Sequence, residues 1–223
     1  MKKYALIVAG GKGTRMCTEV PKQFLLLKGR PVLMHTLEAF YLYSKKIIII
    51  LGLPKDDIIL WEKLCEEHNF KIPHSIVVGG NSRFQTVKRG LDTINEEGLV
   101  AIHDGVRPLI RKEVIAASFN IAQVHKTAVA SLRLKESLRK INQDGSEAVD
   151  RSQYRIIQTP QTFDLDLIKK AYNVEERSWM TDDASVAESS GYSISLFEGH
   201  YENIKITTPS DLPVAEALIK LIH

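Results

Sequence analysis

The sequence predicts an α/β fold in which helices flank a largely parallel β-sheet. Short β-rich runs alternate along the chain with longer stretches whose apolar residues recur near helical spacing, which is the pattern of βαβ units. A length of 223 residues suits one such domain and is enough to bury a substantial core. We therefore expect one domain over residues 1–223, with residues 133–158 projecting from it.

The expected strands are rich in Val, Ile and Leu, and they are predicted over residues 4–9, 46–51, 75–78, 99–103 and 127–132. The expected helices cover residues 32–44, 56–69, 82–95, 112–124, 165–174, 182–190 and 210–222. Strands that alternate with helices in this way run parallel and are covered on both faces. The predicted architecture is therefore Rossmann-like.

Residues 133–158 break this alternation. They are polar, show no helical period and contain the turn Asn142-Gln143-Asp144-Gly145 between two short extended runs. This pattern predicts a β-hairpin arm that projects from the sheet. A hairpin buries little surface by itself, so we expect the arm to pack against a second copy of the chain in a homodimer.

A glycine-rich basic segment follows the first expected strand. Three glycines within residues 10–13 would let backbone N–H groups converge on an anion, and Arg15 and Lys22 add positive charge. The dinucleotide fingerprint does not fit, because Met16 stands where its third glycine belongs, and the Walker A pattern does not fit either. The segment indicates either a triphosphate cradle or simply a tight turn.

Asp104 directly follows an apolar strand end, where a carboxylate is costly to bury without a cation. In doubly wound folds the ligand crevice lies at this end of the strands. A salt bridge to Arg107, three residues later, is one explanation. The other is a Mg²⁺ site, since Mg²⁺ takes one or two carboxylates together with substrate oxygens.

Other segments near the same edge also have two interpretations. Ser82 is a good helix N-cap, but the helix N–H groups behind it and Arg83 would also suit a base or a phosphate. Residues 181–183, Thr-Asp-Asp, are expected to cap a helix, and the alternative is a contact with the substrate. Lys205 is expected in a strand, with its side chain directed to the crevice or to solvent, and His103 is expected to be structural.

Composition excludes several classes of protein. The formal net charge of +3 is small and its basic residues are dispersed, which does not favour nucleic-acid binding. The apolar runs are far shorter than the roughly 20 residues that span a bilayer, and no export signal is visible. Cys17 and Cys65 make neither a disulfide framework nor a metal site. We expect a cytoplasmic protein that binds neither nucleic acid nor membranes.

Six short motifs occur in order along the chain: Ala-Gly-Gly-Lys-Gly-Thr-Arg-Met at 9–16, Pro-Lys-Gln at 21–23, Gly-Gly at 79–80, His-Asp-Gly-Val-Arg-Pro at 103–108, Thr-Pro-Gln at 159–161 and Asn-Ile-Lys-Ile-Thr at 203–207. Taken together, they resemble the 2-C-methyl-D-erythritol 4-phosphate cytidylyltransferase family nearly end to end. The resemblance implies condensation of CTP with methylerythritol phosphate, with release of pyrophosphate, in non-mevalonate isoprenoid synthesis.

The resemblance also implies roles for individual residues. Arg15, Lys22 and Lys205 would be catalytic, Asp104 would lie beside Mg²⁺, and the CTP contacts would be Ala9, Gly10, Gly11, Gly13, Gly80, Asn81, Arg83 and Thr86. The acceptor contacts would be Asp104, Arg107, Ser137, Arg151, Thr159 and Lys205, with Ser137 and Arg151 supplied by the arm of a neighbouring subunit. Asn81 replaces the commoner aspartate of the family motif.

Three other functions remain open at this stage. Ribitol-5-phosphate cytidylyltransferase is the alternative within the same chemistry, because it shares the glycine loop and the His-Asp-x-x-Arg-Pro element. A nicotinamide-dependent oxidoreductase is disfavoured by the missing third glycine. A catalytically silent nucleotide-binding module is disfavoured because both Arg15 and Lys22 are present.

Overall fold

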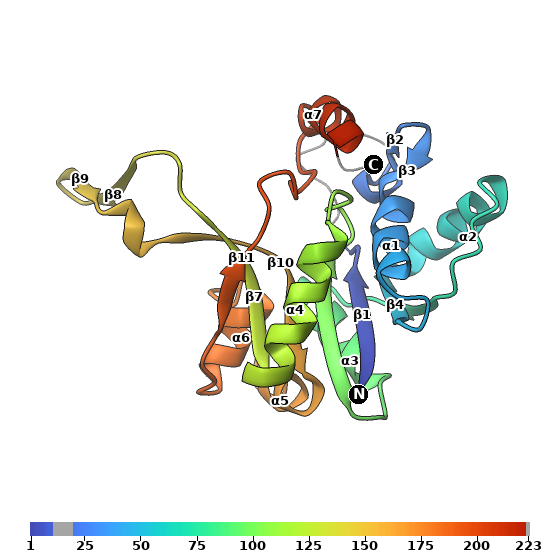
Figure 1. Ribbon diagram of the computed structural model, residues 1–223, viewed down its shortest axis with the longest axis horizontal. Coiled ribbons are helices and arrows are strands. Elements are labelled where there is room, and N and C mark those ends of the chain that lie inside the picture. Colours follow the sequence, from blue (N-terminus) through green and yellow to red (C-terminus); the bar gives the residue numbers. More distant parts are fainter. Residues whose placement is uncertain (11–19, 222–223) are drawn as a thin grey trace.

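A computed structural model describes residues 1–10 and 20–221 of the chain. Seven strands form the central sheet in the order β11-β7-β10-β6-β1-β4-β5 (Figure 1). The strands that the sequence predicted are β1 (Lys2–Val8), β4 (Ile48–Leu53), β5 (Ser75–Val78), β6 (Gly98–Asp104) and β7 (Thr127–Arg133). β1 runs parallel to both β4 and β6, and β4 runs parallel to β5, so the predicted Rossmann-like, mostly parallel sheet is confirmed.

Two strands of the sheet were not predicted. β10 (Arg155–Asp164) lies antiparallel between β6 and β7, and β11 (Leu196–Glu198) runs parallel to β7 at the edge. The predicted strand around Lys205 is wrong, because residues 203–207 form no sheet ladder. The backbone there is held instead by a hydrogen bond from the Ile206 amide to the Val106 carbonyl, at 2.9 Å.

The predicted helices are all present, and most are a residue or more shorter at an end than expected. They are α1 (Val32–Tyr43), α2 (Ile58–Glu67), α3 (Arg83–Asp92), α4 (Lys112–His125), α5 (Leu165–Ala171), α6 (Asp183–Ser189) and α7 (Asp211–Leu218). Short 3-10 turns also occur: η2 (Lys55–Asp57) precedes α2 and η4 (Ile219–Leu221) extends α7, whereas η1 (Lys22–Phe24) is followed by β2 and η3 (Arg151–Gln153) by β10. In the described part of the chain, no helix combines the length and apolarity needed to cross a membrane.

Alternation along β1 separates the two halves of the core. Ala5 and Ile7 face a cluster with α1, α2 and α4, whereas Leu6 and Val8 face a cluster with α3, α5 and α6. A third cluster joins α7 to the segment after β6. Because both faces of the sheet are covered, polar chemistry is confined to its ends.

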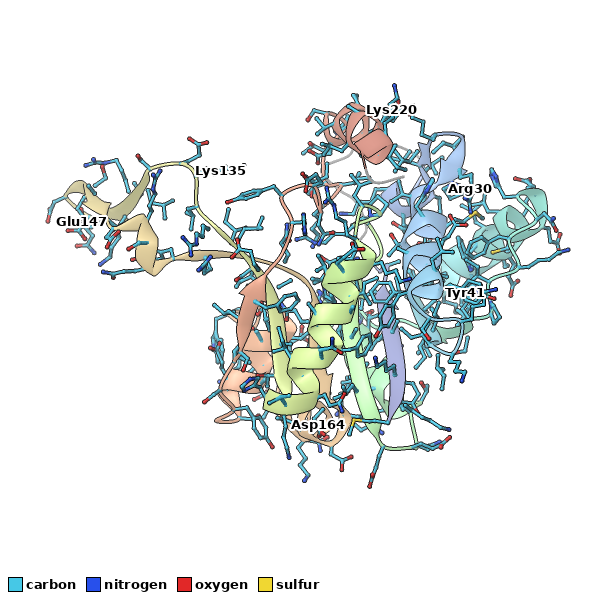
Figure 2. The ribbon with its side chains drawn as sticks, in the orientation of Figure 1. Arg30, Tyr41, Lys135, Glu147, Asp164 and Lys220 are labelled. Carbon is cyan, nitrogen blue, oxygen red and sulfur yellow. The ribbon has the colours of Figure 1, made fainter. Side chains whose placement is uncertain are left out.

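Two small hairpins lie outside the main sheet. β2 (Leu26–Leu27) pairs with β3 (Arg30–Pro31), and β8 (Leu138–Asn142) pairs with β9 (Gly145–Val149). The second is the predicted arm, and it projects far from the sheet (Figure 1). Lys135 lies along the connection to the arm and Glu147 near its tip (Figure 2).

Candidate active site

A cleft of about 1020 Å³ opens at the carboxyl ends of the parallel strands. This is where doubly wound folds bind ligands. Segments after four strands and the turn η1 supply its walls, and the polar or glycine positions among them include Gly10, Lys22, Asp57, Gly80, Asn81, Arg83, Asp104 and Lys205. The structure therefore brings most of the predicted nucleotide-side residues together in one cavity.

Asp104 is the centre of an ionic cluster at the floor of the cleft. Its Oδ2 lies 2.9 Å from the Lys205 ammonium and 3.3 Å from Nε of Arg107, and its Oδ1 lies 3.4 Å from Nε of Arg83. The predicted salt bridge to Arg107 is thus present, within a larger arrangement. Burial alone would raise the pKa of Asp104, but the charges of Arg83, Lys205 and Arg107 outweigh it and hold that pKa far below its usual range. Asp104 is a fixed anion.

Thr159 and His103 hold Asp104 from behind. The Asp104 amide donates to the Thr159 hydroxyl at 3.1 Å, and that hydroxyl pairs with Nδ1 of His103 at 3.0 Å. Nε2 of His103 lies 3.1 Å from the Arg107 carbonyl, which can only accept, so Nε2 carries the proton. Burial lowers the pKa of His103 to about 4 and keeps the ring neutral. The prediction that His103 is structural is confirmed.

Lys205 enters the cleft from an irregular segment. Ile206 is fully buried in the third cluster and Ile204 packs against the same cluster, so Lys205 points the opposite way, toward Asp104. The segment is anchored by Asn203. Its side-chain amide donates to the Thr159 main-chain carbonyl at 2.8 Å, and its main-chain carbonyl accepts from the Arg107 guanidinium at 2.8 Å. Of the two directions that the sequence left open, the side chain takes the one into the cleft.

The start of α3 forms the opposite wall. The Ser82 hydroxyl accepts from the Gln85 amide at 3.1 Å, which confirms the predicted N-cap. The Gly80 amide donates to the Thr86 hydroxyl at 3.0 Å, so the buried Thr86 supports the loop backbone. A Cβ at Gly80 would lie 2.3 Å from Cβ of Gln85, which leaves room only for glycine. Gly80, Asn81 and Ser82 expose a short polar strip to the cleft.

Lys22 lines the cleft from the turn η1. It begins η1, its side chain is largely buried, and it lines the cavity beside Gln23. Gln23 donates to Asp57 at 2.8 Å, which ties η1 to the start of α2. Ala9 and Gly10 also line the cleft. The predicted residues Gly11, Gly13 and Arg15 lie outside the described residues.

A family model for 2-C-methyl-D-erythritol 4-phosphate cytidylyltransferase matches residues 4–221. This chain belongs to that family. A Bacteroides fragilis protein named for the same activity is 52% identical over 219 residues, which cover 98% of this chain and 100% of the relative. A Bacteroides thetaiotaomicron relative of the same name is 48% identical over 219 residues, with 98% and 100% covered. The family recognised from the motifs is confirmed, and the ribitol phosphate alternative is not favoured.

Solved structures of cytidylyltransferase relatives share the fold. The 4-diphosphocytidyl-2C-methyl-D-erythritol synthase of Anaerococcus prevotii superposes with a TM-score of 0.84 at 29% identity, covering 98% of this chain and 96% of that one. The 2-C-methyl-D-erythritol 4-phosphate cytidylyltransferase of Thermus thermophilus gives 0.79 at 29% identity, covering 99% and 100%. The activity is therefore a nucleotidyl transfer.

Of the residues that the family resemblance placed at the acceptor, Asp104 and Lys205 line the cleft formed by the described residues, whereas Arg107 and Thr159 bind Asp104 without lining it. The remaining two are not brought to the cleft. Ser137 and Arg151 are exposed on the arm, and the Arg151 guanidinium donates to the Lys135 carbonyl. Neither lines the cavity formed by the described residues of this chain. Their family role therefore needs a second subunit or a movement of the arm.

Sequence reasoning missed the function of Asp183. It was grouped with Asp182 as a helix cap, and Asp182 does form a capping box with Ser185. Asp183 instead crosses to α3 and binds the fork of Arg83, at 2.9 and 2.7 Å. The only signal in the sequence was the pair of consecutive aspartates, because one of them suffices to cap the helix.

Proposed function

We propose that this protein transfers the cytidylyl group of CTP to 2-C-methyl-D-erythritol 4-phosphate and releases pyrophosphate. The observation that carries the proposal is the Asp104 cluster, which presents Lys205 to a cleft of nucleotide size in a chain of this family. In the reaction, an acceptor phosphate oxygen forms a bond to the α-phosphorus of CTP. The bond from that phosphorus to the bridging oxygen breaks, and its electron pair leaves with pyrophosphate.

The described residues suit this chemistry because nucleotidyl transfer needs positioning and charge stabilisation more than proton transfer. The acceptor phosphate is already anionic at neutral pH, so it needs no general base. Lys22 and Lys205 bring two ammonium groups to the cleft from separate segments. We assign Lys22 to the triphosphate, together with Arg15, and Lys205 to the transferred phosphoryl group.

We also propose that Mg²⁺ accompanies CTP, with Asp104 as its protein ligand. Among the described residues, Oδ1 of Asp104 has only the long 3.4 Å contact with Arg83, which leaves it able to accept a cation. Among the described residues there is no cluster of three or more His, Cys, Asp or Glu side chains that could hold a metal alone. Phosphate oxygens and water would complete the set that Mg²⁺ prefers, and the ion would neutralise phosphate charge.

The test of the function is pyrophosphate release with CTP and two competing acceptors. Methylerythritol phosphate should react and ribitol 5-phosphate should not, and CTP should be preferred over the other nucleoside triphosphates. Turnover of ribitol 5-phosphate alone would overturn the proposal. For the metal, calorimetry should show that Mg²⁺ tightens CTP binding in the wild type and much less in Asp104→Asn.

We propose in addition that two copies pair through the arm, so that Ser137 and Arg151 of one copy serve the cleft of the other. The support is apolar exposure: Ile141 on β8 is 77% exposed, and Tyr154 and Ile156 at the base of the arm are also exposed. Burial of such side chains against a partner would stabilise the dimer.

A cytoplasmic location is supported by Cys65, which is a free thiol.

Mixing two inactive variants tests the shared site. A Lys22→Ala subunit has a defective cleft and an intact arm, and an Arg151→Ala subunit has the reverse. In a mixed dimer, one cleft would be intact and would receive an intact arm, so mixing should restore activity. If the arm serves its own subunit, the mixture stays inactive, and sedimentation shows separately whether dimers form.

A further inference from the structure

Asp183 is a fully buried carboxylate that does not line the cleft. It is the first residue of α6, and both of its oxygens are used by Arg83, the first residue of α3. Its Oδ1 also accepts from the Tyr172 hydroxyl at 2.6 Å. A parallel, two-bonded pair of this kind fixes the direction of the guanidinium as well as its distance.

Arg83 lies between two carboxylates and is bound unequally. Its two terminal nitrogens contact Asp183 at 2.9 and 2.7 Å, whereas only Nε approaches Asp104, at 3.4 Å. Burial alone would lower the pKa of Arg83, but Asp183 and Asp104 raise it well above the ordinary value, so the charge is permanent. Without Asp183, the nearest carboxylate for that fork would be Asp104.

Asp104 already has a partner that matters more for the reaction. Its Oδ2 holds the Lys205 ammonium at 2.9 Å, and Lys205 extends into the cleft. Arg83 released onto Asp104 would compete with Lys205 for the same carboxylate. An arginine fork usually wins such a competition, because it makes two charge-assisted bonds where lysine makes one.

The structure fixes α6 so that Asp183 stays in this place. Gln161 of β10 donates to Asp182 at 2.8 Å and accepts from the Ala184 amide at 2.8 Å, one contact on each side of Asp183. Two residues earlier on the same strand, Thr159 supports Asp104. The Thr-Pro-Gln motif therefore sets the spacing between the two carboxylates that share Arg83.

We infer that Asp183 is a positioning residue for nucleotidyl transfer: it holds Arg83 away from Asp104 and so keeps Lys205 on Asp104, directed into the cleft. The inference rests on the proposed function. It assigns Arg83 to the support of this cluster, in place of the base contact that the family motif implied.

The test is a double-mutant cycle measured by pyrophosphate release. Asp183→Asn should lower kcat roughly 10-fold or more with less than about a 3-fold change in KM for CTP, since coupled charge pairs give effects of this size. In an Arg83→Gln background the same change should lower kcat by less than about 2-fold, because the competing fork is gone. Asp183→Glu, which keeps the carboxylate, should recover part of the loss.

A second measurement reports on Lys205 without any turnover. Limited acetylation followed by mass spectrometry should modify Lys205 faster in Asp183→Asn than in the wild type, since the ammonium is released from Asp104. Asp164→Ala is the matched control for stability. Asp164 caps α5 through the Leu167 amide and lies at the opposite end of the molecule from α7 (Figure 2). It should lower the melting temperature and leave kcat and Lys205 acetylation unchanged.

Equal losses of kcat in the wild-type and Arg83→Gln backgrounds, or unchanged Lys205 acetylation, would overturn the inference. A wild-type enzyme that releases no pyrophosphate would instead refute the proposed function. If Asp183→Asn does not fold, Asp183→Glu is measured in its place, because it keeps the carboxylate but shifts it by one methylene against the Arg83 fork. It should lower kcat less in the Arg83→Gln background than in the wild type, and equal losses in the two backgrounds would count against the role.

Discussion

Acidification should destabilise this protein through His103 at pH values where few other groups titrate. His103 is fully buried, and its neutral form satisfies every contact around it: Nε2 donates to the Arg107 carbonyl and Nδ1 accepts from the Thr159 hydroxyl. Burial lowers its pKa to about 4. A second proton would bind Nδ1, which could then no longer accept a hydrogen bond from the Thr159 hydroxyl. The protonated ring would also place a positive charge next to Arg107.

The magnitude follows from the pKa of the folded and unfolded states. A histidine in an unfolded chain has a pKa of about 6.5, so the difference from the folded value corresponds to about 3 kcal/mol of stability. Because the folded pKa is the lower one, this stability is complete above pH 6.5 and is lost as the pH falls toward 4. By pH 5 about 2 kcal/mol of it is gone. The pKa of Asp104 is also depressed in the folded state, so the stability that its ionised form contributes is lost only as the pH falls below the unfolded carboxyl pKa of about 3.9.

Urea unfolding at a series of pH values between 7 and 4.5 measures this dependence, with the fluorescence of the buried Trp61 as the signal. His103→Gln should be less stable than the wild type at pH 7, and its stability should change much less over the same range. His125→Gln, at an exposed position on α4, controls for removal of an imidazole and should follow the wild-type curve. A His103→Gln curve parallel to the wild type would refute the reasoning.

Three further predictions concern the cleft. Lys205→Met should lower kcat by about 10²-fold, as expected for loss of one transition-state contact. Its melting temperature should change little, because Asp104 keeps its contacts with Arg83 and Arg107. A wild-type kcat would contradict the role of Lys205. Lys22→Ala should lower turnover by about 10²-fold or more, and wild-type kinetics would remove it from the site. Thr159→Val should cost about 1–3 kcal/mol in urea unfolding, because the Asp104 amide and Nδ1 of His103 lose their partner; Thr159→Ser should recover most of this, and equal losses in both variants would argue against the hydroxyl.

The sequence predicted the parallel strands and the helices well, because their apolar patterns depend on local chain geometry and burial on both faces. It missed β10 for a physical reason. Gln158, Thr159, Gln161 and Thr162 are buried in that strand although they are polar, and the first three are hydrogen-bonded to neighbouring segments of the site. A strand whose side chains serve a site does not show the apolar pattern by which strands are recognised.

The candidate site was predicted in part. The Asp104–Arg107 pair is local, three residues apart, and could be proposed from spacing. The Arg83–Asp183 pair joins residues 100 positions apart, and nothing in the spacing distinguishes Asp183 from the capping Asp182. Lys205 shows the opposite error, since Ile204 and Ile206 imitate a strand while the backbone pairs with the loop at Val106.

The antiparallel direction of β10 has a structural consequence. The chain leaves the arm at Arg151 and reaches Thr159 only eight positions later, with the pairing to β7 at Arg155–Ile157 between them. A parallel strand would have started at the far end of the sheet and kept the arm remote from Asp104. The strand that begins beside the arm therefore also carries Thr159, so a partner bound to the arm would contact a segment that is continuous in the chain with the residue holding the central carboxylate.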